Sequence, residues 1–277
     1  MQTIRRTAEL RELLAALRAG GGRVALVPTM GALHAGHLSL VAEARRRAEH
    51  VVASIFVNPL QFGAGEDLDR YPRRERADAA LLSEVGVAVL WAPAADDMYP
   101  DGFASTVSVS GITDGFEGAT RPGHFDGVAT VVAKLFGQVR PDVALFGEKD
   151  WQQLQLIRRM ATDLDLGVEV VGVPTMRDAD GLALSSRNAY LTPEARTAAR
   201  AMPRALGEAA AALGRGTAAD DALAAGRAAL ERAGFEVDYL ALIDGASMRP
   251  IDAVVDGARL IAAARIDGTR LIDNLAV

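Results

Sequence analysis

The chain has 277 residues, a formal net charge of -6 at pH 7 and no cysteine. An acidic chain without a basic stripe argues against a nucleic-acid partner, and the missing thiols exclude disulfides, thiolate metal sites and a cysteine nucleophile. Charged residues between Arg5 and Glu12 interrupt the apolar region that a signal peptide needs, and no apolar run reaches membrane-spanning length. We therefore expect a soluble cytoplasmic protein with neither nucleic-acid nor membrane partners.

Up to about residue 175, short apolar segments alternate with amphipathic ones. Strands are expected at 24–27, 51–57, 87–91, 143–146 and 168–173. Helices are expected near 38–47, 76–84, 128–139 and 151–163. This alternation predicts an α/β fold, a Rossmann-like doubly wound parallel sheet with helices on both faces, in which ligands bind beyond the carboxyl ends of the strands.

The pattern changes after Pro193. Ala-rich helices are expected at 194–213 and 218–233, followed by strands near 237–243, 259–266 and 269–271. These elements predict a smaller C-terminal α+β domain. We place the boundary near residue 175, which divides the chain into domains of residues 1–175 and 176–277.

From Val24 to Leu38 an apolar strand runs through a glycine turn into a helix that carries His34 and His37. The N–H groups and the positive dipole end of such a helix form an anion site. Residues three apart lie on one helix face, and Gly36 lets a ligand approach the backbone. We expect this helix start to bind a triphosphate. Ordinary polar residues of a βα turn and two ligands of a zinc site are the alternatives.

Asn58 and Gln61 follow the second strand among apolar neighbours. Gln61 can donate and accept at once, and can therefore orient a hydroxyl or carboxylate of a small substrate. Asn58 is consistent with the same pocket or with an Asx cap of the turn at Pro59.

A glycine-punctuated loop beginning at Arg121 leads into the next helix. Asp126 is expected to be the N-cap of that helix, with Gly127 beside it. Arg121 and His124 are candidates for a lid or a subunit contact.

Gly147, Glu148, Lys149 and Asp150 come directly after the fourth strand. Lys149 is one of only two lysines, which favours a function over a surface Lys–Asp pair. Its ammonium can neutralise phosphate, and Asp150 can hold a ribose hydroxyl or a magnesium-bound water. Gln153, one turn later, faces the same way.

Ser185, Ser186 and Arg187 lie at the domain junction. Two hydroxyls and a guanidinium form a compact set of donors for phosphate oxygens. Capping of a turn before Pro193 by the serines is the alternative.

Five motifs, taken in order, closely resemble those of the pantothenate synthetase family, which shares the HIGH signature of nucleotidylyltransferases. They occupy residues 28–37, 58–62, 121–125, 147–153 and 180–188. The resemblance implies ATP-dependent condensation of pantoate with β-alanine through a pantoyl-adenylate, releasing AMP and pyrophosphate. It also implies Mg²⁺ bridging the phosphates, a homodimer, an ATP- and pantoate-binding first domain and a lid-like second domain.

The resemblance further implies roles for individual residues. Catalytic roles fall to His34, His37, Lys149 and Arg187. Pantoate or β-alanine would contact Gln61, Gln153 and Asn58, and Asp78 falls on the magnesium side. The ATP site would be lined by Met30, Gly31, Ala32, Leu33, His34, Ala35, Gly36, His37, Gly147, Glu148, Lys149, Asp150, Met176, Leu184, Ser185, Ser186 and Arg187. Family members commonly have valine at the position of Met176.

A plain nucleotidylyltransferase is the nearest alternative. It would need charged residues for an acceptor phosphate where Asn58 and Gln61 stand. A tRNA synthetase would need a longer chain with an anticodon-binding extension. A nucleotide sensor without turnover would keep the fold, but His37 and Lys149 argue against it.

Overall fold

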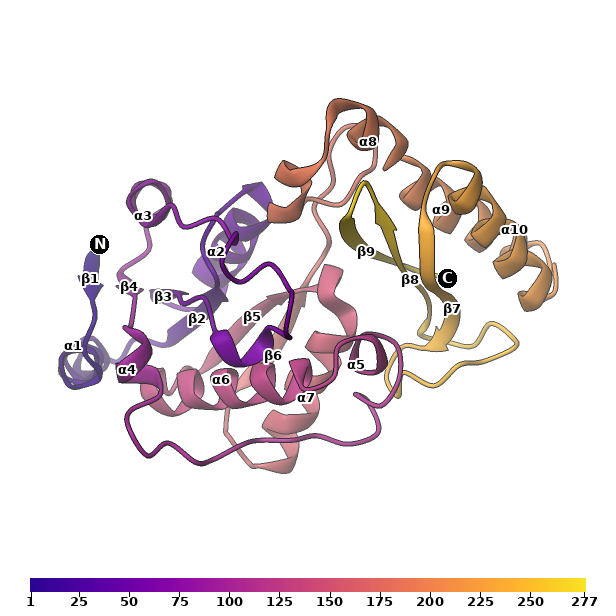
Figure 1. The fold of residues 1–277 in the computed structure, drawn as a ribbon. Helices are drawn as coiled ribbons and strands as arrows, with labels where there is room; N and C mark the ends of the chain where they lie inside the picture. Colours follow the sequence, from indigo (N-terminus) through magenta and orange to yellow (C-terminus); the bar gives the residue numbers. More distant parts are fainter. The chain divides into compact units, whose positions relative to one another are not determined.

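The computed structural model describes residues 1–277. The chain divides into two compact units (Figure 1). The first consists of Met1–Glu148 and Leu156–Pro174, and the second of Lys149–Gln155 and Thr175–Val277. The second unit thus includes a short segment that lies far from the rest of it in the sequence.

A six-stranded sheet forms the centre of the first unit, in the order β1-β4-β3-β2-β5-β6. Every pair of neighbours in it is parallel. The strands are β1 (Gln2–Ile4), β2 (Val24–Thr29), β3 (His50–Ile55), β4 (Val89–Trp91), β5 (Val143–Gly147) and β6 (Glu169–Val173). The doubly wound parallel sheet expected from the sequence is confirmed, and the short β1 adds an edge strand.

Helices cover both faces of this sheet. They are α1 (Thr7–Ala19), α2 (Ala35–Arg47), α3 (Glu75–Glu84), α4 (Ala95–Met98), α5 (Glu117–Thr120), α6 (His124–Val139) and α7 (Trp151–Asp163), with 3₁₀ turns η1 (Pro59–Gln61) and η2 (Glu148–Asp150). On one face Leu40 and Val41 of α2 and Leu82 of α3 pack against β2, β3 and β5. Elsewhere α6 packs against α1 and β2. No helix in the chain combines the length and apolar character needed to cross a bilayer.

The strand order changes direction beside β2. From β2 the chain builds outward through β3 to β4 on one side, then returns to add β5 and β6 on the other. β2 and β5 therefore flank the switch point, where open α/β sheets bind ligands beyond the carboxyl ends of their strands. The glycine turn before His34 follows β2, and Gly147 ends β5. Two of the predicted ATP-binding motifs thus begin at the strands that flank the switch point.

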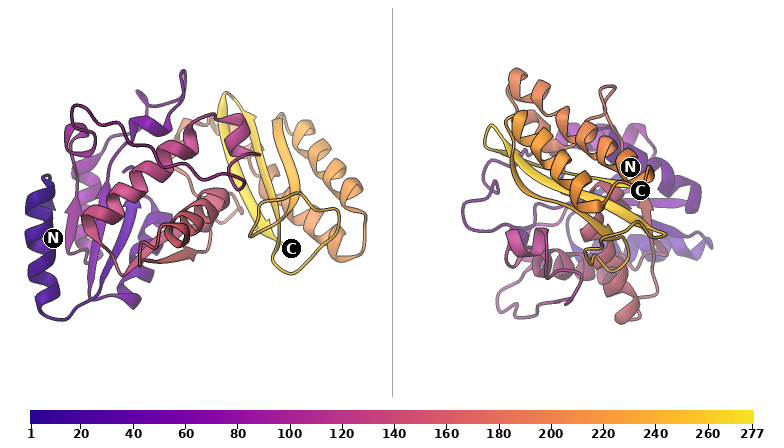
Figure 2. Two further views of the ribbon diagram at one scale, coloured as in Figure 1. Left: turned by 90° about the horizontal axis from the view of Figure 1, so that it is seen from below. Right: turned by 90° about the vertical axis from the view of Figure 1, so that its right-hand side faces the viewer.

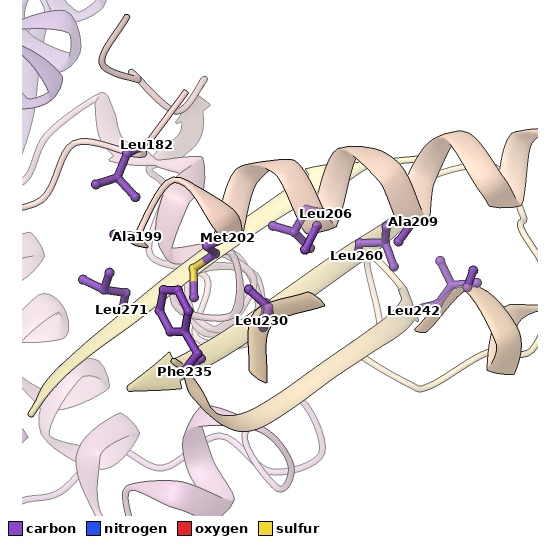
Figure 3. Packing of buried hydrophobic residues seen from close by; sticks show 14 of the residues in the cluster. Leu182, Ala199, Met202, Leu206, Ala209, Leu230, Phe235, Leu242, Leu260 and Leu271 are labelled. Atoms are coloured by element: carbon purple, nitrogen blue, oxygen red, sulfur yellow. The ribbon is translucent and has the colours of Figure 1, made fainter. Parts of the chain in front are cut away.

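The second unit is built on a three-stranded antiparallel sheet of β7 (Glu236–Asp244), β8 (Ala258–Ile266) and β9 (Thr269–Ala276). Helices α9 (Ala201–Gly214) and α10 (Ala219–Arg232) lie on one face of it (Figure 2). Leu206 and Leu230 of these helices meet Leu242, Leu260 and Leu271 of the strands in a common core (Figure 3). This arrangement confirms the smaller C-terminal α+β part.

The helix expected at 194–213 is wrong as a single element. It is divided into α8 (Pro193–Ala198) and α9. Pro203 has no N–H to donate to Ala199, and the Met202 N–H donates to the Ala199 carbonyl oxygen instead, at 3.1 Å. This i to i−3 bond tightens the chain and separates the two helices.

Candidate active site

The turn after β2 is held by a buried carboxylate. Gly31 has φ 83° and Ala32 has φ 52°, a left-handed pair for which glycine is suited at the first position. The N–H groups of Ala32 and Leu33 donate to the two carboxylate oxygens of Asp78, each at 2.9 Å. Asp78 comes from α3 and is 3% exposed. Successive N–H groups that converge on an anion form a rigid nest, and here Asp78 fills it.

Asp78 therefore fixes the backbone immediately before His34. Both of its oxygens already accept backbone hydrogen bonds. This geometry supports a role in shaping the turn, and it does not favour the magnesium-side role that the resemblance implies. No cluster of three or more His, Cys, Asp or Glu side chains is arranged to hold a metal ion.

His34 and His37 cap α2 reciprocally. His34 is the N-cap residue and lies just before the helix, which begins at Ala35. Its Nδ1 accepts from the Gly36 N–H at 3.1 Å, and the His37 Nδ1 accepts from the His34 N–H at 3.3 Å. The two ring centroids are 4.1 Å apart. The histidines predicted to share a face are thus side by side, although only His37 lies within the helix.

The capping bonds also assign the tautomers of both rings. A nitrogen that accepts a backbone N–H carries no proton, so each neutral imidazole carries its hydrogen on Nε2. Both rings therefore present an N–H donor at the positive end of α2. This combination of helix dipole and directed donors suits a phosphate.

Gln61 is oriented by Asn58. The Asn58 amide donates to Gln61 Oε1 at 3.1 Å and to the Gly127 carbonyl oxygen at 3.0 Å. The Asn58 Oδ1 accepts from the Leu60 N–H at 3.3 Å, which makes Asn58 the Asx cap of η1. Tyr99, which the sequence did not single out, donates to the same oxygen at 2.7 Å. Asn58 is fully buried. Its geometry supports holding Gln61 rather than contacting a substrate.

Two hydrogen bonds fix the orientation of the Gln61 side-chain amide. Because its Oε1 accepts from Asn58, its NH₂ group points the other way and donates to Met30 Sδ at 3.2 Å. A sulfur is a weak acceptor, and the amide has a second hydrogen. Gln61 can therefore still donate to a hydroxyl or carboxylate.

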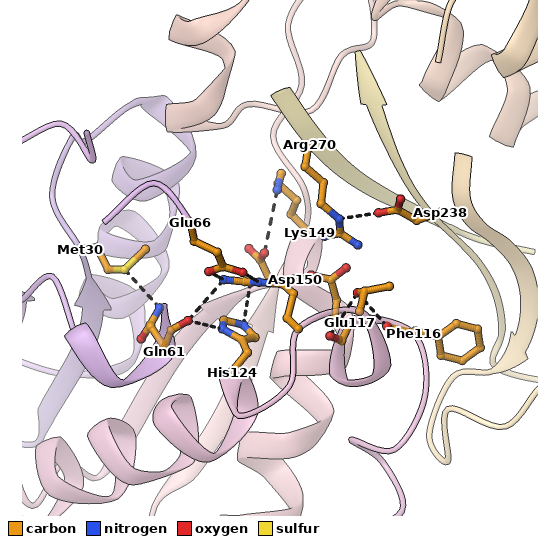
Figure 4. A network of polar contacts seen from close by, with 12 residues as sticks. Met30, Gln61, Glu66, Phe116, Glu117, His124, Lys149, Asp150, Asp238 and Arg270 are labelled. Atoms are coloured by element: carbon orange, nitrogen blue, oxygen red, sulfur yellow. Dashed lines mark hydrogen bonds and ion pairs between the residues drawn. The ribbon is translucent and has the colours of Figure 1, made fainter. Parts of the chain in front are cut away.

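Arg121 and His124 both donate to the backbone of the same turn, and Figure 4 shows His124 beside Gln61. The His124 Nδ1–H donates to the Gln61 carbonyl oxygen at 2.8 Å, and Nε2 accepts from Arg121 at 3.0 Å. Arg121 makes two further bonds of 2.7 Å to the carboxylate of Glu66. The Arg121 guanidinium lowers the pKa of Glu66 to about 2. Within the chain, both residues thus hold the Gln61 turn, and Glu66 is a partner that the sequence pattern did not reveal.

The predicted N-cap of α6 is wrong. The helix begins at His124, and its N-cap is Gly123, whose φ is 79°. Asp126 lies inside the first turn, where its Oδ1 accepts from the Ser108 hydroxyl at 2.7 Å. The left-handed Gly123 starts the helix three residues earlier than an Asp126 cap would.

His124 should make stability depend on pH. Burial, followed by repulsion from Arg121, lowers its pKa to about 4 from 6.5. Between those values the unfolded chain binds a proton that the folded chain does not, so the free energy of unfolding should rise with pH and level off above 6.5. Denaturant unfolding at about pH 5 and about pH 7 measures the difference.

His124→Gln is the matched variant, because a glutamine amide offers one donor and one acceptor in place of the two ring nitrogens. It should reduce the pH dependence of unfolding in this window. Glu66 contributes less in this window, since its pKa is about 2 in the folded chain and 4.5 in the unfolded chain, so it is mostly ionised in both states above pH 5. An unchanged pH dependence in the variant would rule out His124 as its source.

Lys149 begins the segment that belongs to the second unit. Its side chain is 18% exposed, and its Nζ lies 3.9 Å from Asp150 Oδ1. Asp150 is more exposed, at 46%. Gln153 is partly exposed in the first turn of α7. The segment thus offers an ammonium, a carboxylate and an amide within five residues.

The predicted phosphate-binding loop forms a narrow hairpin-like structure in the second unit. Arg177 and Ala183 pair as an antiparallel bridge, and the Leu184 N–H donates to the Met176 carbonyl oxygen at 2.9 Å. Ser185 then caps η3 (Ser186–Tyr190), because its Oγ accepts from the Arg187 N–H at 3.2 Å. The capping alternative is therefore confirmed for Ser185. Its hydroxyl hydrogen remains a donor for other groups.

The predicted site residues therefore fall into two sets. The first unit contains Asn58, Gln61, Asp78, Gly147, Glu148 and the residues from Met30 to His37. The second unit contains Lys149, Asp150, Gln153, Met176, Leu184, Ser185, Ser186 and Arg187.

Comparisons with known proteins cover almost the whole chain. Residues 2–276 match the sequence model of the family described as pantoate-beta-alanine ligase. The chain is 63% identical to the pantothenate synthetase of Rhizorhabdus wittichii, over 100% of this chain and 99% of that protein. It is 59% identical to the pantothenate synthetase of Sphingopyxis alaskensis, over 100% of both.

Solved structures give the same result. The crystal structure of pantothenate synthetase from Thermus thermophilus is similar with a TM-score of 0.95 and 54% identity, over 99% of both chains. That of the pantoate-beta-alanine ligase from Francisella tularensis complexed with beta-gamma ATP and beta-alanine has a TM-score of 0.85 and 31% identity, over 100% of this chain and 97% of that one. The chain therefore belongs to the pantoate-beta-alanine ligase family.

Proposed function

We propose that this chain, an ATP-dependent ligase that forms pantothenate, works in two steps through a pantoyl-adenylate. First, a carboxylate oxygen of pantoate attacks the α-phosphorus of ATP, and the bond to pyrophosphate breaks. The β-alanine amine then attacks the acyl carbon, loses a proton and displaces AMP. The observation that carries this proposal is the reciprocally capped start of α2, with two Nε2–H donors beside the switch point.

The first step needs positioning and charge stabilisation more than covalent help from the protein. His34 and His37, with the N-terminus of α2, are suited to bind phosphoryl oxygens. Lys149 supplies a positive charge for the departing pyrophosphate. Ser186 and Arg187 add donors of the kind that phosphate prefers.

Magnesium, when bound, would neutralise phosphate charge. Mg²⁺ in nucleotide sites is commonly held by one or two carboxylates together with substrate phosphates. Asp150 fits this role, because its carboxylate is half-exposed and adjoins Lys149. Asp78 suits this role less, since each of its oxygens already accepts a backbone N–H, from Ala32 or from Leu33.

Gln61→Ala should weaken the binding of pantoate more than the binding of ATP. Removing the amide deletes a donor held in place by Asn58, and one neutral hydrogen bond corresponds to a loss of roughly 10-fold. Steady-state kinetics should show this as a higher KM for pantoate with the KM for ATP little changed. Leu60→Ala, at an exposed position in the same turn, is the control and should alter neither value. Equal weakening of both substrates would contradict a pantoate contact.

The reaction itself is tested by pyrophosphate release from ATP and Mg²⁺ with pantoate, with and without β-alanine, and with the products identified by mass. Pantothenate and AMP should accumulate only when both substrates are present. A small burst of pyrophosphate without β-alanine should reveal the adenylate. A stable nucleotidylated product would support the nucleotidylyltransferase alternative, and ATP binding without release would support the sensor.

We also propose a homodimer, as the resemblance implies, and a cytoplasmic location, as expected from the sequence. Light scattering coupled to size-exclusion chromatography tests the first point. A mass of about 29.1 kDa, that of one chain, would contradict it.

A further inference from the structure

Two polar neighbours interrupt the apolar pattern of β9. Asp273 is 3% exposed and Asn274 is 5% exposed. Adjacent residues of a strand point to opposite faces of the sheet. Asp273 shares the face of Leu271, which packs in the helix-covered core, and Asn274 lies on the other face. Polar side chains at such positions need partners, and these two find them in different segments of the chain.

Asn274 holds the Lys149 segment. Its Nδ2 donates to the Lys149 carbonyl oxygen at 2.8 Å, and its Oδ1 accepts from Arg259. Arg259 pairs with Ala276 across β8 and β9, so Arg259 and Asn274 are diagonal neighbours on one face. The Arg259 bond therefore fixes which way the Asn274 amide points, and leaves its NH₂ group for Lys149.

Trp151 provides a second set of contacts that hold the same segment. The Arg259 guanidinium lies over the indole, 3.5 Å from the ring centroid, and the indole N–H donates to the Gly245 carbonyl oxygen at 2.7 Å. A Cβ at Gly245 would lie 2.4 Å from the Gly257 carbonyl oxygen, so only glycine fits there. Lys149 and Asp150 are thus followed directly by an anchored residue.

Asp273 holds the other phosphate-binding segment. Arg177 donates to its two carboxylate oxygens at 2.6 and 2.9 Å, a bidentate pair. The same guanidinium donates to the carbonyl oxygens of Gly181 at 3.1 Å and Asn274 at 3.2 Å. Arg177 is in the hairpin that leads to Ser185, and η3, which carries Ser186 and Arg187, also contacts β9.

We propose that Asp273 and Asn274 are positioning residues for the ligase reaction, which hold the Lys149 segment and the Arg177–Arg187 loop on one strand. This inference rests on the phosphate roles proposed above for Lys149, Ser186 and Arg187. Two phosphate-binding segments tied to adjacent residues keep a fixed relation to each other. A displacement of about 1 Å in a reacting group can cost on the order of 100-fold in rate, so such a tie has a large effect on catalysis.

Stability alone does not account for this pair. A buried ion pair contributes little net stability compared with apolar residues of the same volume. The immediate neighbours of Asp273 on the helix side of the sheet are apolar, with Ala262 opposite it in the register and Leu271 two positions away. An apolar residue at position 273 could not bind Arg177, and one at position 274 could not donate to the Lys149 carbonyl oxygen.

The test is Asn274→Asp. This change keeps the size and the acceptor for Arg259, but it replaces the NH₂ donor with an oxygen that faces the Lys149 carbonyl oxygen. Adenylate formation in a single turnover should be slowed roughly 10–100-fold. The KM for pantoate should change little. Asp238→Asn is the control, because it removes a carboxylate that binds Arg270 and Arg265 in the same sheet.

A double-mutant cycle separates positioning from a general structural effect. If Asn274 acts through Lys149, Asn274→Asp should cause no further loss in a Lys149→Ala background. Losses that multiply, or a full rate in Asn274→Asp alone, would overturn the proposal. A full rate in Lys149→Ala would instead overturn the proposed role of Lys149, which keeps the two failures distinct.

A second variant covers the case in which Asn274→Asp does not fold. Arg259→Gln removes the guanidinium that orients Asn274 and covers Trp151, but leaves the backbone pairing of β8 and β9 in place. Like Asn274→Asp, it should slow adenylate formation but cause no further loss of rate in a Lys149→Ala background. For the contact between Asp273 and Arg177, Asp273→Asn should slow adenylation. It should cause no further loss of rate in an Arg187→Ala background. Additive losses in either test would remove that residue from the proposal.

Discussion

His37→Ala should slow adenylate formation by about 10²–10³-fold, the scale expected for one donor that stabilises transition-state charge. The His37 Nδ1 accepts from the His34 N–H, so Nε2 is its donor at the start of α2. Alanine removes that donor. It also removes the acceptor for the His34 N–H, which is one half of the reciprocal cap of α2. Rapid-quench measurement of pyrophosphate release gives the rate, and circular dichroism gives the stability. Loss of a cap costs about 1 kcal/mol, which should leave the chain folded.

His37→Gln separates the two effects. A glutamine at the third helical position can accept from the backbone N–H of the N-cap residue, as in the common capping box. The thermal midpoint should therefore return toward that of the unaltered chain while most of the rate loss remains. If a folded His37→Ala variant kept its full rate, this helix start would not bind the reacting phosphates.

Lys149→Ala should cause a loss of similar size, about 10²–10³-fold in adenylate formation. The side chain is mostly buried beside the more exposed Asp150. Its removal takes away the positive charge that we propose stabilises the departing pyrophosphate. The KM for pantoate should be affected less than the rate. Lys149→Arg should recover part of the rate, because the charge returns on a larger, planar group.

The chain supplies its own control, since Lys134 is the only other lysine. Its Nζ lies 4.8 Å from the ring centroid of Phe103 and 5.9 Å from that of Tyr99, which gives it a cation–π role. Lys134→Ala should lower stability slightly and leave the rate of adenylation unchanged. Equal rate losses in the two variants would mean that general charge, and not the place of Lys149, matters.

The parallel sheet was predictable because its strands are short apolar runs separated by amphipathic helices. β1 was missed, because Gln2–Ile4 has only three residues and takes its stability from pairing with β4. β9 was expected to end at 271 but continues to Ala276. Asp273 and Asn274 break its apolar pattern, and only their partners elsewhere in the chain make strand geometry favourable there.

The site was predictable where its signal is local. His34 and His37 lie in one turn, and so do Asn58 and Gln61, so spacing alone brought each pair together. Tyr99 and Glu66 could not be found this way, because their bonds to Asn58 and Arg121 join residues 41 and 55 positions apart. The resemblance implies only a magnesium-side position for Asp78, and it takes the folded structure to show that its carboxylate accepts from the backbone N–H groups of Ala32 and Leu33.

One of the boundaries between the two units falls inside α7, between Gln155 and Leu156. The polypeptide therefore passes from one unit to the other three times, and no single cut yields both of them whole. A fragment that ends at Pro174 keeps Trp151 but loses the Arg259 and Gly245 that anchor it. Chimeras that exchange residues 175–277 between relatives would need to exchange residues 149–155 as well, so that the anchor and the anchored segment come from one parent.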